Sequence, residues 1–495
     1  MTCEEDGPRV ATRRGLLAGA AATAATAAGA GLAAPAGAAP RRRRADVVVV
    51  GAGLSGLIAA RDVAAAGRSV LVVEASGRVG GRIRNVSIGG GEVVEGGAEY
   101  IGPTQSRMAA LAAQLGVATF PAYNTGSNLY VREGRVTPYD ALGLPPDPEG
   151  LPDAGGAIAK LDALAAEVDL DAPWRSPRAR EWDAQTLETW LLANTTTASG
   201  RLLLDVAVTS VFSFEPRELS LLFVLFYIRA AGDQRRPGSL VRLISVAGGA
   251  QERRFAGGSQ RIPLALAERL GRRRLILDAP VRRIAQSGSG VRLEAGDTVV
   301  RGRQVIVALP TTLAGRIAYA PALPARRDQL TQRLPCGSVI KVHAVYDRPF
   351  WRDAGLTGQI VSDAGPARVS FDNSPPRGRR GVLMAFIEAS DARAYAGRPQ
   401  ALRAAALENF STAFGARAAR PRRFLITDWD AEPYSRGGPV GCAGPGVLTG
   451  FGAALRRPVG RIHWAGTDTA THWNGYMEGA LRAGERAARE ALRAL

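Results

Sequence analysis

The sequence is poor in the residues that metal-centred and hydrolytic chemistry uses. It has three cysteines, at positions 3, 336 and 442, and three histidines, His343, His463 and His472. Cysteines this few and this widely spaced provide neither a disulfide framework nor the paired spacing of a metal cluster. With so few histidines and no nucleophile-elbow motif, a Ser/His/Asp hydrolase is poorly supported. We therefore predict no bound metal and no hydrolytic triad.

Lysine is also scarce: the chain has two, Lys160 and Lys341, against 61 arginines, and a formal net charge of +18. Such an excess can mark binding to nucleic acid or to an anionic membrane. No basic stretch is interleaved with aromatics, however, and neither a zinc spacing nor a recognition-helix pattern occurs. We predict a solvated basic surface and no nucleic-acid partner. The 495 residues, 46% of them hydrophobic, predict two or three domains with a large core.

The first 44 residues differ from the rest and read as a leader. TRRGLL at Thr12–Leu17 resembles a twin-arginine export motif, and an Ala/Gly/Thr-rich stretch follows to about residue 39. Ala36-Gly37-Ala38 fits the small-x-small pattern of a cleavage site. The stretch is too weakly apolar for a membrane span, and Pro35 interrupts it. The prediction is export of the protein, and a cytoplasmic location is the alternative.

The next segment predicts a nucleotide-binding unit. Val47–Val50 is an apolar run typical of a buried parallel strand, and GAGLSG follows at Gly51–Gly56, before a predicted helix. Gly51, Gly53 and Gly56 permit a tight turn and a close approach of the backbone, including that of Leu54 and Ser55, to a pyrophosphate. A second predicted strand ends at Glu74, 23 residues after Gly51. Its carboxylate can accept hydrogen bonds from ribose hydroxyls and would repel a 2′-phosphate, which disfavours NADP.

The residues that follow Glu74 distinguish an FAD-binding site from an NAD-binding site. EASGRVGGR at Glu74–Arg82 places a second glycine pair and arginines just past the ribose-binding acid. This pattern resembles the FAD fingerprint of flavin amine oxidases, in which Arg82 would contact the diphosphate or the flavin side. The prediction is therefore an α/β fold: an FAD-binding Rossmann-like domain of the GR2 type with an interleaved α+β substrate domain.

From about residue 45 to the end, the chain resembles the flavin-containing monoamine oxidase family. The motifs that carry the resemblance are EGGAEYIGPTQ at 95–105, GGAQER at 248–253, Pro280-Val281, GSVIK at 337–341, PFW at 349–351 and GTDTATHWNGYMEGA at 466–480. The resemblance implies an amine oxidation that forms an imine, which hydrolyses to an aldehyde, while O₂ is reduced to H₂O₂. It also implies cofactor contacts from Gly97, Ala98, Val281, Trp429, Gly466, Thr467, Asp468 and Met477.

The last of these motifs precedes a predicted helix that runs almost to the end of the chain. The resemblance implies that the N-terminus of this helix faces the flavin, where its partial positive charge would stabilise the reduced cofactor. It also implies that Tyr476 stands beside the flavin as one wall of an aromatic cage.

Three positions depart from the family pattern. Gly438 stands where mammalian members carry the cysteine that tethers the flavin, and Cys442 lies four residues too late, so FAD is predicted to be non-covalent. Pro439 replaces the second cage aromatic. Arg316 replaces the lysine that holds a water near the flavin, so we expect either a similar role for its donors or an altered reaction with oxygen. Tyr476 and Arg316 are the predicted catalytic residues.

The resemblance implies a substrate pocket with Ile244, Gln251 and Tyr346 on its wall, and a discontinuous domain division. The FAD-binding domain is predicted at 45–121, 255–305 and 430–495, and the substrate domain at 122–254 and 306–429. The Pro/Gly-rich residues 143–156 are predicted to form a loop inside the substrate domain. Because the sequence stops soon after the last helix, no membrane anchor is expected. A homodimer is left open.

Other functions on the same fold are open at this point. An L-amino-acid oxidase would need an arginine for the substrate carboxylate, and a polyamine oxidase would need acids along its substrate tunnel, none of which the sequence assigns. A desaturase or a protoporphyrinogen-oxidase-like enzyme fits the GTDTATHWNGYMEGA motif less well. A non-enzymatic binding protein that keeps FAD is the alternative outside catalysis.

Overall fold

The computed structural model describes residues 41–376 and 378–495. Most of the predicted leader, residues 1–40, lies outside these residues. Arg41–Arg44, which the prediction included in the leader, form strand β1 and pair in parallel with β13 (Thr298–Gly302). Arg41–Arg44 are therefore part of the folded chain, because backbone pairing makes these four arginines the edge of a sheet while their side chains stay exposed.

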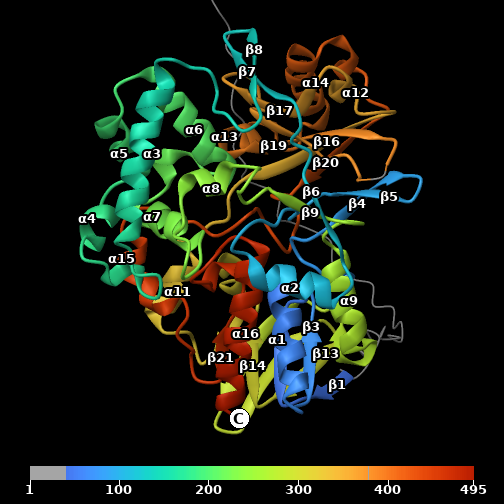
Figure 1. The fold of residues 1–495 in the computed structure, drawn as a ribbon. Helices are drawn as coiled ribbons and strands as arrows, with labels where there is room; N and C mark the ends of the chain where they lie inside the picture. Colours follow the sequence, from blue (N-terminus) through green and yellow to red (C-terminus); the bar gives the residue numbers. More distant parts are fainter. Residues whose placement is uncertain (1–40, 377) are drawn as a thin grey trace, which may run out of the picture. The chain divides into compact units, whose positions relative to one another are not determined.

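A five-stranded parallel sheet carries the nucleotide-binding signals. Its strands lie in the order β10 (Leu275–Ile276), β3 (Val70–Val73), β2 (Val47–Val50), β14 (Gln304–Val307) and β21 (Ile462–Trp464). All four valines of β2 are buried, as expected for a strand that is covered on both faces. Helices α1 (Leu54–Ala65) and α16 (Met477–Arg493) pack side by side on one face, so segments from opposite ends of the sequence meet there (Figure 1).

The other face of this sheet packs against a second five-stranded sheet. Its order is β1, β13, β12 (Gly290–Ala295), β11 (Val281–Ser287) and β15 (Ala318–Ala320). Alternate side chains of β2 explain the layering: Val47 and Val49 join the core under α1 and α16, whereas Val48 and Val50 join the core shared with β11, β12 and β13. Because of this alternation, the parallel sheet can be covered by helices on one face and by the second sheet on the other.

A seven-stranded sheet and a group of helices form the rest of the described chain. The sheet order is β20 (Arg423–Asp428), β16 (Val339–Tyr346), β19 (Gly381–Glu388), β18 (Val369–Asp372), β17 (Leu356–Ser362), β7 (Ser127–Arg132) and β8 (Arg135–Asp140). The helices include α3 (Gly150–Ala166), α6 (Ala198–Phe212), α7 (Leu221–Ala230) and α8 (Leu240–Ile244), which share one apolar core (Figure 1). Residues 150–156 are thus helical, which corrects the predicted loop over 143–156.

The remaining elements are α2 (Ser106–Gln114), α4 (Ala179–Asp183), α5 (Leu187–Asn194), α9 (Arg261–Leu270), α10 (Thr311–Ala314), α11 (Ala325–Thr331), α12 (Phe350–Asp353), α13 (Ala389–Tyr395), α14 (Pro399–Phe414), α15 (Val447–Phe451), β4 (Asn85–Gly89), β5 (Glu92–Glu95), β6 (Thr119–Pro121) and β9 (Arg253–Phe255). Short 3₁₀ turns, such as Thr467–Thr469, connect several of them. Across the described residues, no helix has the length and apolar character needed to span a bilayer.

Strand pairing shows which segments belong to the nucleotide-binding side and which belong to the substrate side. The helical group and the seven-stranded sheet lie within the ranges 122–254 and 306–429 predicted for the substrate domain, but β14 and β15 do not follow that division. β14 pairs with β2, and β15 pairs with β11, so structure of the nucleotide side continues to residue 320. The predicted boundary between 305 and 306 cuts through β14 and lies too early in the chain.

Candidate active site

One cavity of about 400 Å³ connects the nucleotide side with the helical group and the seven-stranded sheet. Segments far apart in the sequence form its wall, from the glycine turn after β2 to the start of α16. Of the predicted site residues, those on the cavity wall are Gly51, Gly53, Leu54, Ser55, Glu74, Arg82, Gly97, Ala98, Gln251, Val281, Arg316, Trp429, Gly466, Thr467, Tyr476 and Met477.

The glycine turn shapes one end of the cavity. Gly51 has a φ of +101°, which an L side chain rarely adopts, and a Cβ at Gly56 would overlap the carbonyl oxygen of Gly51. Gly53 is different, because a Cβ there would meet no protein atom within 4 Å and would point into open space on the cavity wall. The turn thus leaves room for a ligand at Gly53, directly before the free N–H groups at the start of α1.

Glu74 joins the turn to the next loop. One of its carboxylate oxygens accepts a hydrogen bond from the Ala52 N–H at 2.6 Å, and the other accepts from the Ser76 N–H at 2.9 Å. The carboxylate lies on the cavity wall at the end of β3, where the sequence placed a partner for ribose hydroxyls. Its two backbone contacts fix its orientation relative to Gly53.

A second helix N-terminus lies on the same wall. α16 begins at Met477, and Tyr476, Met477 and Ala480 all line the cavity. The Gly466 N–H donates to Ser55 Oγ at 2.9 Å, which connects the approach to α16 with the first turn of α1. Two helix N-termini therefore point partial positive charge at one elongated cavity. An elongated ligand with an anionic middle and an electron-rich end fits this arrangement.

Two of the predicted cofactor residues support the wall from behind. Asp468 is buried and accepts a hydrogen bond from the Thr311 N–H at 2.8 Å, which connects the loop before α16 with the start of α10. Gly56 lies behind the glycine turn. Neither residue is on the cavity wall. Their positions agree with a role in shaping the site and give no direct contact with its contents.

Tyr476 lies on the wall, and other rings surround it. Its ring centroid is 4.8 Å from that of Trp473, which is buried, and 6.2 Å from that of Tyr227, which also lines the cavity. Pro439 lines the cavity at the position of the missing cage aromatic, and Arg82 Nη1 donates to its carbonyl oxygen at 2.6 Å. Trp429 is also on the wall, where its Nε1 donates to the Gly96 carbonyl at 2.9 Å.

The predicted substrate-pocket residues separate into two groups. Gln251 lines the cavity, and its side-chain amide donates to the Leu243 carbonyl at 2.9 Å. Ile244 packs against the helical core and is absent from the wall, whereas its neighbour Leu243 is present. Tyr346 is buried in another core with Phe350 and Trp351. The pocket prediction for Tyr346 is therefore corrected, because its side chain is buried in a packing interior, whereas the prediction for Ile244, which is half-buried beside the wall, stays a prediction.

Arg316 reaches the cavity wall from the segment between α10 and β15, and it is exposed. An exposed guanidinium keeps its own hydration and is poorly suited to holding a single buried water. The catalytic role predicted for Arg316 stays a prediction.

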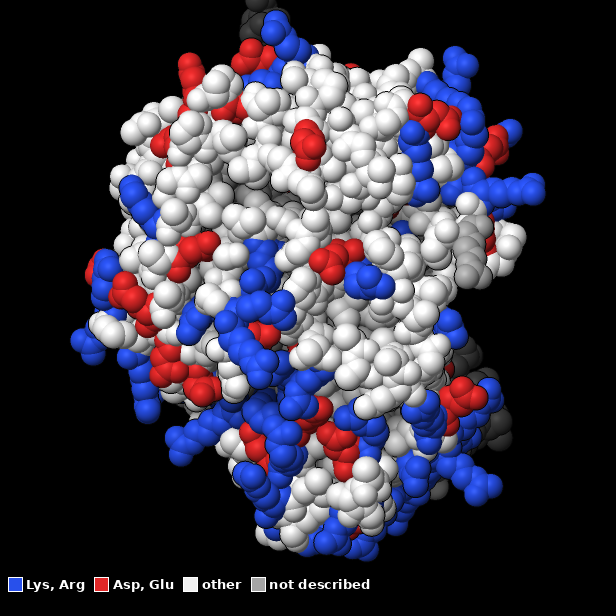
Figure 2. Space-filling view, in the orientation of Figure 1, with Lys and Arg blue, Asp and Glu red and all other residues white. Residues whose placement is uncertain are grey.

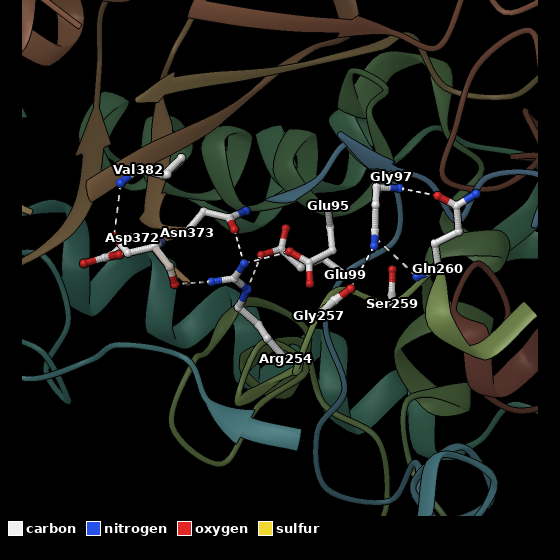
Figure 3. Close-up of polar contacts among 12 residues, drawn as sticks. Glu95, Gly97, Glu99, Arg254, Gly257, Ser259, Gln260, Asp372, Asn373 and Val382 are labelled. Carbon is white, nitrogen blue, oxygen red and sulfur yellow. Dashed lines mark hydrogen bonds and ion pairs between the residues drawn. The ribbon is translucent and has the colours of Figure 1, made fainter. Parts of the chain in front are cut away.

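A buried ion network that the sequence did not reveal centres on Arg254, Glu95 and Glu99 (Figure 3). The Arg254 guanidinium pairs with Glu95 at 2.7 Å and with Glu99 at 2.8 Å, and it also contacts the Asn373 side chain. Glu99 also pairs with the Lys341 ammonium, which donates to the Gly97 carbonyl at 3.1 Å. Burial raises the pKa of Glu95, an effect that the Arg254 charge opposes.

Because Glu99, Lys341 and Gly97 all lie on the cavity wall, this network fixes the wall at the join between the two halves of the chain. EGGAE and GSVIK already contained three of its four charged residues, and Arg254 directly follows GGAQER, but the pairing between them is long-range. The sequence signal that could have found it is the presence of two acids and two bases inside otherwise apolar motifs.

Comparison with known proteins identifies the family. The profile of the family described as "Flavin containing amine oxidoreductase" matches residues 54–492. The chain belongs to this family. It is 39% identical over 452 residues to a Dictyostelium discoideum protein named "Probable flavin-containing monoamine oxidase A", over 90% of this chain and 97% of that protein.

Two solved amine oxidases have the same fold. Wild-type putrescine oxidase bound to putrescine matches with a TM-score of 0.86 and 33% identity, over 91% of this chain and 100% of that chain. Cyclohexylamine oxidase from Brevibacterium oxydans IH-35A matches with a TM-score of 0.86 and 35% identity, over 91% of this chain and 99% of that chain. The predicted family, the α/β fold with a Rossmann-like FAD-binding domain, and the FAD cofactor are confirmed.

This flavin amine oxidase also has a cavity residue that sequence reasoning missed. Glu388 ends β19 and lines the cavity, although no motif contained it. Its only sequence signal is an acid directly after the apolar run VLMAFI at 382–387. The alternation of a strand decides which face such an acid takes, and the register of β19 was not predictable.

Proposed function

We propose that this enzyme oxidises a small primary or secondary amine with FAD held by non-covalent contacts alone. The observation that supports the proposal is the single cavity between the glycine turn and the N-terminus of α16, with Tyr476 on its wall. When bound, FAD would supply the redox chemistry: it takes the two electrons and the proton lost from the amine α-carbon, and O₂ receives them together with the proton lost from the amine nitrogen, which gives H₂O₂. The imine product hydrolyses to an aldehyde and ammonia, or to an aldehyde and a primary amine when the substrate is a secondary amine.

The residues around the cavity would bind the cofactor, orient the substrate and exclude water. Gly53, the start of α1 and Glu74 would hold the pyrophosphate and ribose, and the N-terminus of α16 would favour negative charge on the reduced cofactor. Tyr476 would direct the amine toward the cofactor. Within the described chain, none of the histidines lines the cavity, so an amine that enters neutral needs no histidine base.

The test is direct. Purified protein should be yellow, and an anaerobic amine should bleach the flavin absorbance, with H₂O₂ appearing when O₂ is admitted. A colourless protein that does not bind added FAD would contradict the proposal. A yellow protein inert to every amine would favour a binding role instead.

The absence of a covalent tether is part of this proposal. Gly438 is on the cavity wall in the place of a cysteine, and Cys442 is buried away from the wall. Acid precipitation should leave the yellow colour in the supernatant. Colour that stays with the pellet would refute the proposal.

Amino acids are less suitable substrates than amines. The arginines on the cavity wall, Arg78, Arg82, Arg282 and Arg316, come from loops and strands of the nucleotide side, and none comes from the helical group or the seven-stranded sheet. Among the described residues, the substrate side therefore offers no arginine clamp for a substrate carboxylate. The two solved neighbours are named for a diamine and for a monoamine, so they leave the number of substrate amino groups open.

We also propose export by a twin-arginine route, which rests on Thr12–Leu17 and the following Ala-rich stretch alone. Replacing Arg13 and Arg14 by lysine in the full-length chain should retain the enzyme in the cytoplasmic fraction. Equal export of the variant and the wild type would contradict this route.

A further inference from the structure

The side chain of Glu388 faces the cavity from the substrate side. Glu388 is the last residue of β19 and lies opposite Val339 of β16, which is also on the cavity wall. One carboxylate oxygen accepts a hydrogen bond at 3.2 Å from the hydroxyl of Ser213, which follows α6 and lines the cavity too. The acid is therefore held in place by one neutral donor, while its carboxylate adjoins the space that a substrate would occupy.

No cation within the described parts of the chain, 41–376 and 378–495, forms an ion pair with Glu388. Among the described residues, Arg368 before β18 is the charged group that acts on Glu388, and Arg368 and Asp391 of α13 line a small pocket together with it. Arg368 is itself paired with Asp205 at 2.8 Å. The cation that acts on Glu388 is therefore already engaged by another acid, although the molecule as a whole carries a net charge of +18.

Burial raises the pKa of the Glu388 carboxyl to about 8, since only the Ser213 hydroxyl and the charge of Arg368 favour its ionised form. A buried carboxylate without a cation is costly, and a bound ammonium group would remove that cost. Glu388 therefore lacks the cationic partner that would stabilise its ionised form.

Val339 connects Glu388 with the segment that contains Gly438 and Pro439. A Cβ on Gly438 would be 3.4 Å from Val339 Cγ1, and Val339 is the strand neighbour of Glu388. Pro439, the next residue, presents no ring of aromatic type. Gly438 and Pro439 thus add no aromatic ring to this part of the wall.

Glu388 and Phe386 form the partition between the main cavity and a small second pocket. That pocket is also lined by Arg368 and Asp391, together with Val206 and Thr209 of α6. An acid at this point is available to a group that extends away from the reacting end of a substrate. The cavity thus offers an apolar and aromatic region near Tyr476 and an acid elsewhere on its wall.

We propose that Glu388 binds a second, non-reacting ammonium group of the substrate, so that the preferred substrates are diamines. This inference rests on the proposed amine oxidation and names its substrate class. The second ammonium stays protonated, pairs with the carboxylate of Glu388, and fixes how far the reacting amine extends toward the flavin side. Glu388 is thus a residue that determines specificity, and takes no part in the transfer of electrons.

The experiment compares Glu388→Gln with the wild type on two matched series: 1,n-diaminoalkanes with three to eight carbons and n-alkylamines of the same lengths. The wild type should prefer the diamines. The variant should lose on the order of 100-fold in kcat/KM with the best diamine, mostly through KM, and change little with the alkylamines. The substituted amide keeps the length of the side chain and can still accept the hydrogen bond from Ser213.

Two further variants make the test specific. Glu388→Asp keeps the charge on a shorter side chain, so its optimum should move to a longer diamine. Asp391→Asn removes a nearby acid that does not line the main cavity, and it should leave the diamine preference intact. A yellow protein with a normal melting temperature shows in each case that the variant is folded.

Several results would overturn the inference and leave the proposed function standing. These are equal wild-type activity on both series, an equal loss on both series in Glu388→Gln, and an equal loss of diamine preference in Asp391→Asn. If no amine of either series bleaches the flavin, the proposed function itself fails.

Discussion

At the scale of single residues, glycine positions determine whether the chain accommodates its cofactor. Gly53 has a φ of −68°, which any residue can adopt, and its missing side chain leaves open space in the cavity. Gly56 is in the opposite situation, because a Cβ there would overlap the backbone of Gly51. The same motif thus contains one glycine required for ligand space and one required for the fold.

We therefore expect Gly53→Val to fold and to bind FAD at least tenfold more weakly, because the new side chain occupies the ligand space. The measurements are the melting temperature of the apoprotein and a titration with FAD. Gly56→Ala is the comparison, and it should lower the melting temperature of the apoprotein itself. Normal FAD affinity in Gly53→Val would show that the cofactor lies elsewhere in the cavity.

The Glu388 carboxyl predicts a pH dependence of stability. Its pKa is about 8 in the folded chain and 4.5 in an ordinary glutamate, so the folded chain binds this proton more tightly. Its contribution to stability is complete below pH 4.5 and is lost as the pH rises through 8. Glu388→Gln should match the wild type near pH 4.5 and exceed it by about 1–3 kcal/mol at pH 9.

The measurement for this prediction is the difference in melting temperature between Glu388→Gln and the wild type across that pH range, without substrate. An exposed substitution, Glu133→Gln, serves as the control for surface charge. A difference that does not change with pH would mean that Glu388 titrates normally.

At the scale of elements, the buried network connects β9, β16 and the loop after β5. Arg254 follows the first residue of β9, Lys341 lies on β16, and Glu95 and Glu99 lie at and after the end of β5. The Arg254 and Glu95 side chains are 3% and 1% exposed. Since solvent does not screen them, the loss of one partner leaves its counter-ions buried and unpaired.

Arg254→Met should destabilise the protein by about 3–5 kcal/mol, because Glu95 loses its partner and Glu99 keeps only Lys341. The readout is the melting temperature of the apoprotein at pH 7. Arg422→Met, which breaks the exposed pair with Asp347, should cause no measurable change. An equal change in melting temperature in the two variants would show that the buried network contributes no more to stability than the exposed pair.

The elements also show what the sequence could predict. The glycine turn, Glu74 and the start of α16 were predictable, because each depends on a local motif whose residue types and spacing carry the chemistry. Tyr346 and Glu388 were not, because the side a residue faces on a strand depends on register and packing. The Arg254 network was not predictable, because its members come together only in the folded chain. The strand at Arg41–Arg44 was not predictable either, because it forms by pairing with a distant strand at 298–302.

At the scale of the whole molecule, charge is unevenly distributed. On the face drawn in Figure 2, Lys and Arg side chains gather over the lower part, where Figure 1 places α16, β14 and β21, and the upper part carries fewer charges. A net charge of +18 raises the potential around every approach to the cavity. A cationic amine must therefore approach Glu388 through a repulsive field.

Salt should weaken that repulsion. We expect kcat/KM with a diamine to rise about two- to fivefold between 20 and 200 mM salt, and to rise less with an alkylamine, which carries one charge. Stopped-flow flavin bleaching at constant pH measures this. A decrease with salt would mean that the acids near Glu388 dominate the approach.

The hydrogen bond from Gly466 to Ser55 has a consequence for synthesis in the cell. The two residues are 411 positions apart, and both lie on the cavity wall. A ribosome that has translated the first half therefore presents a glycine turn with no opposing wall. Flavin loading has to wait until almost the whole polypeptide has emerged, and prematurely terminated products should leave the ribosome unable to retain the pigment.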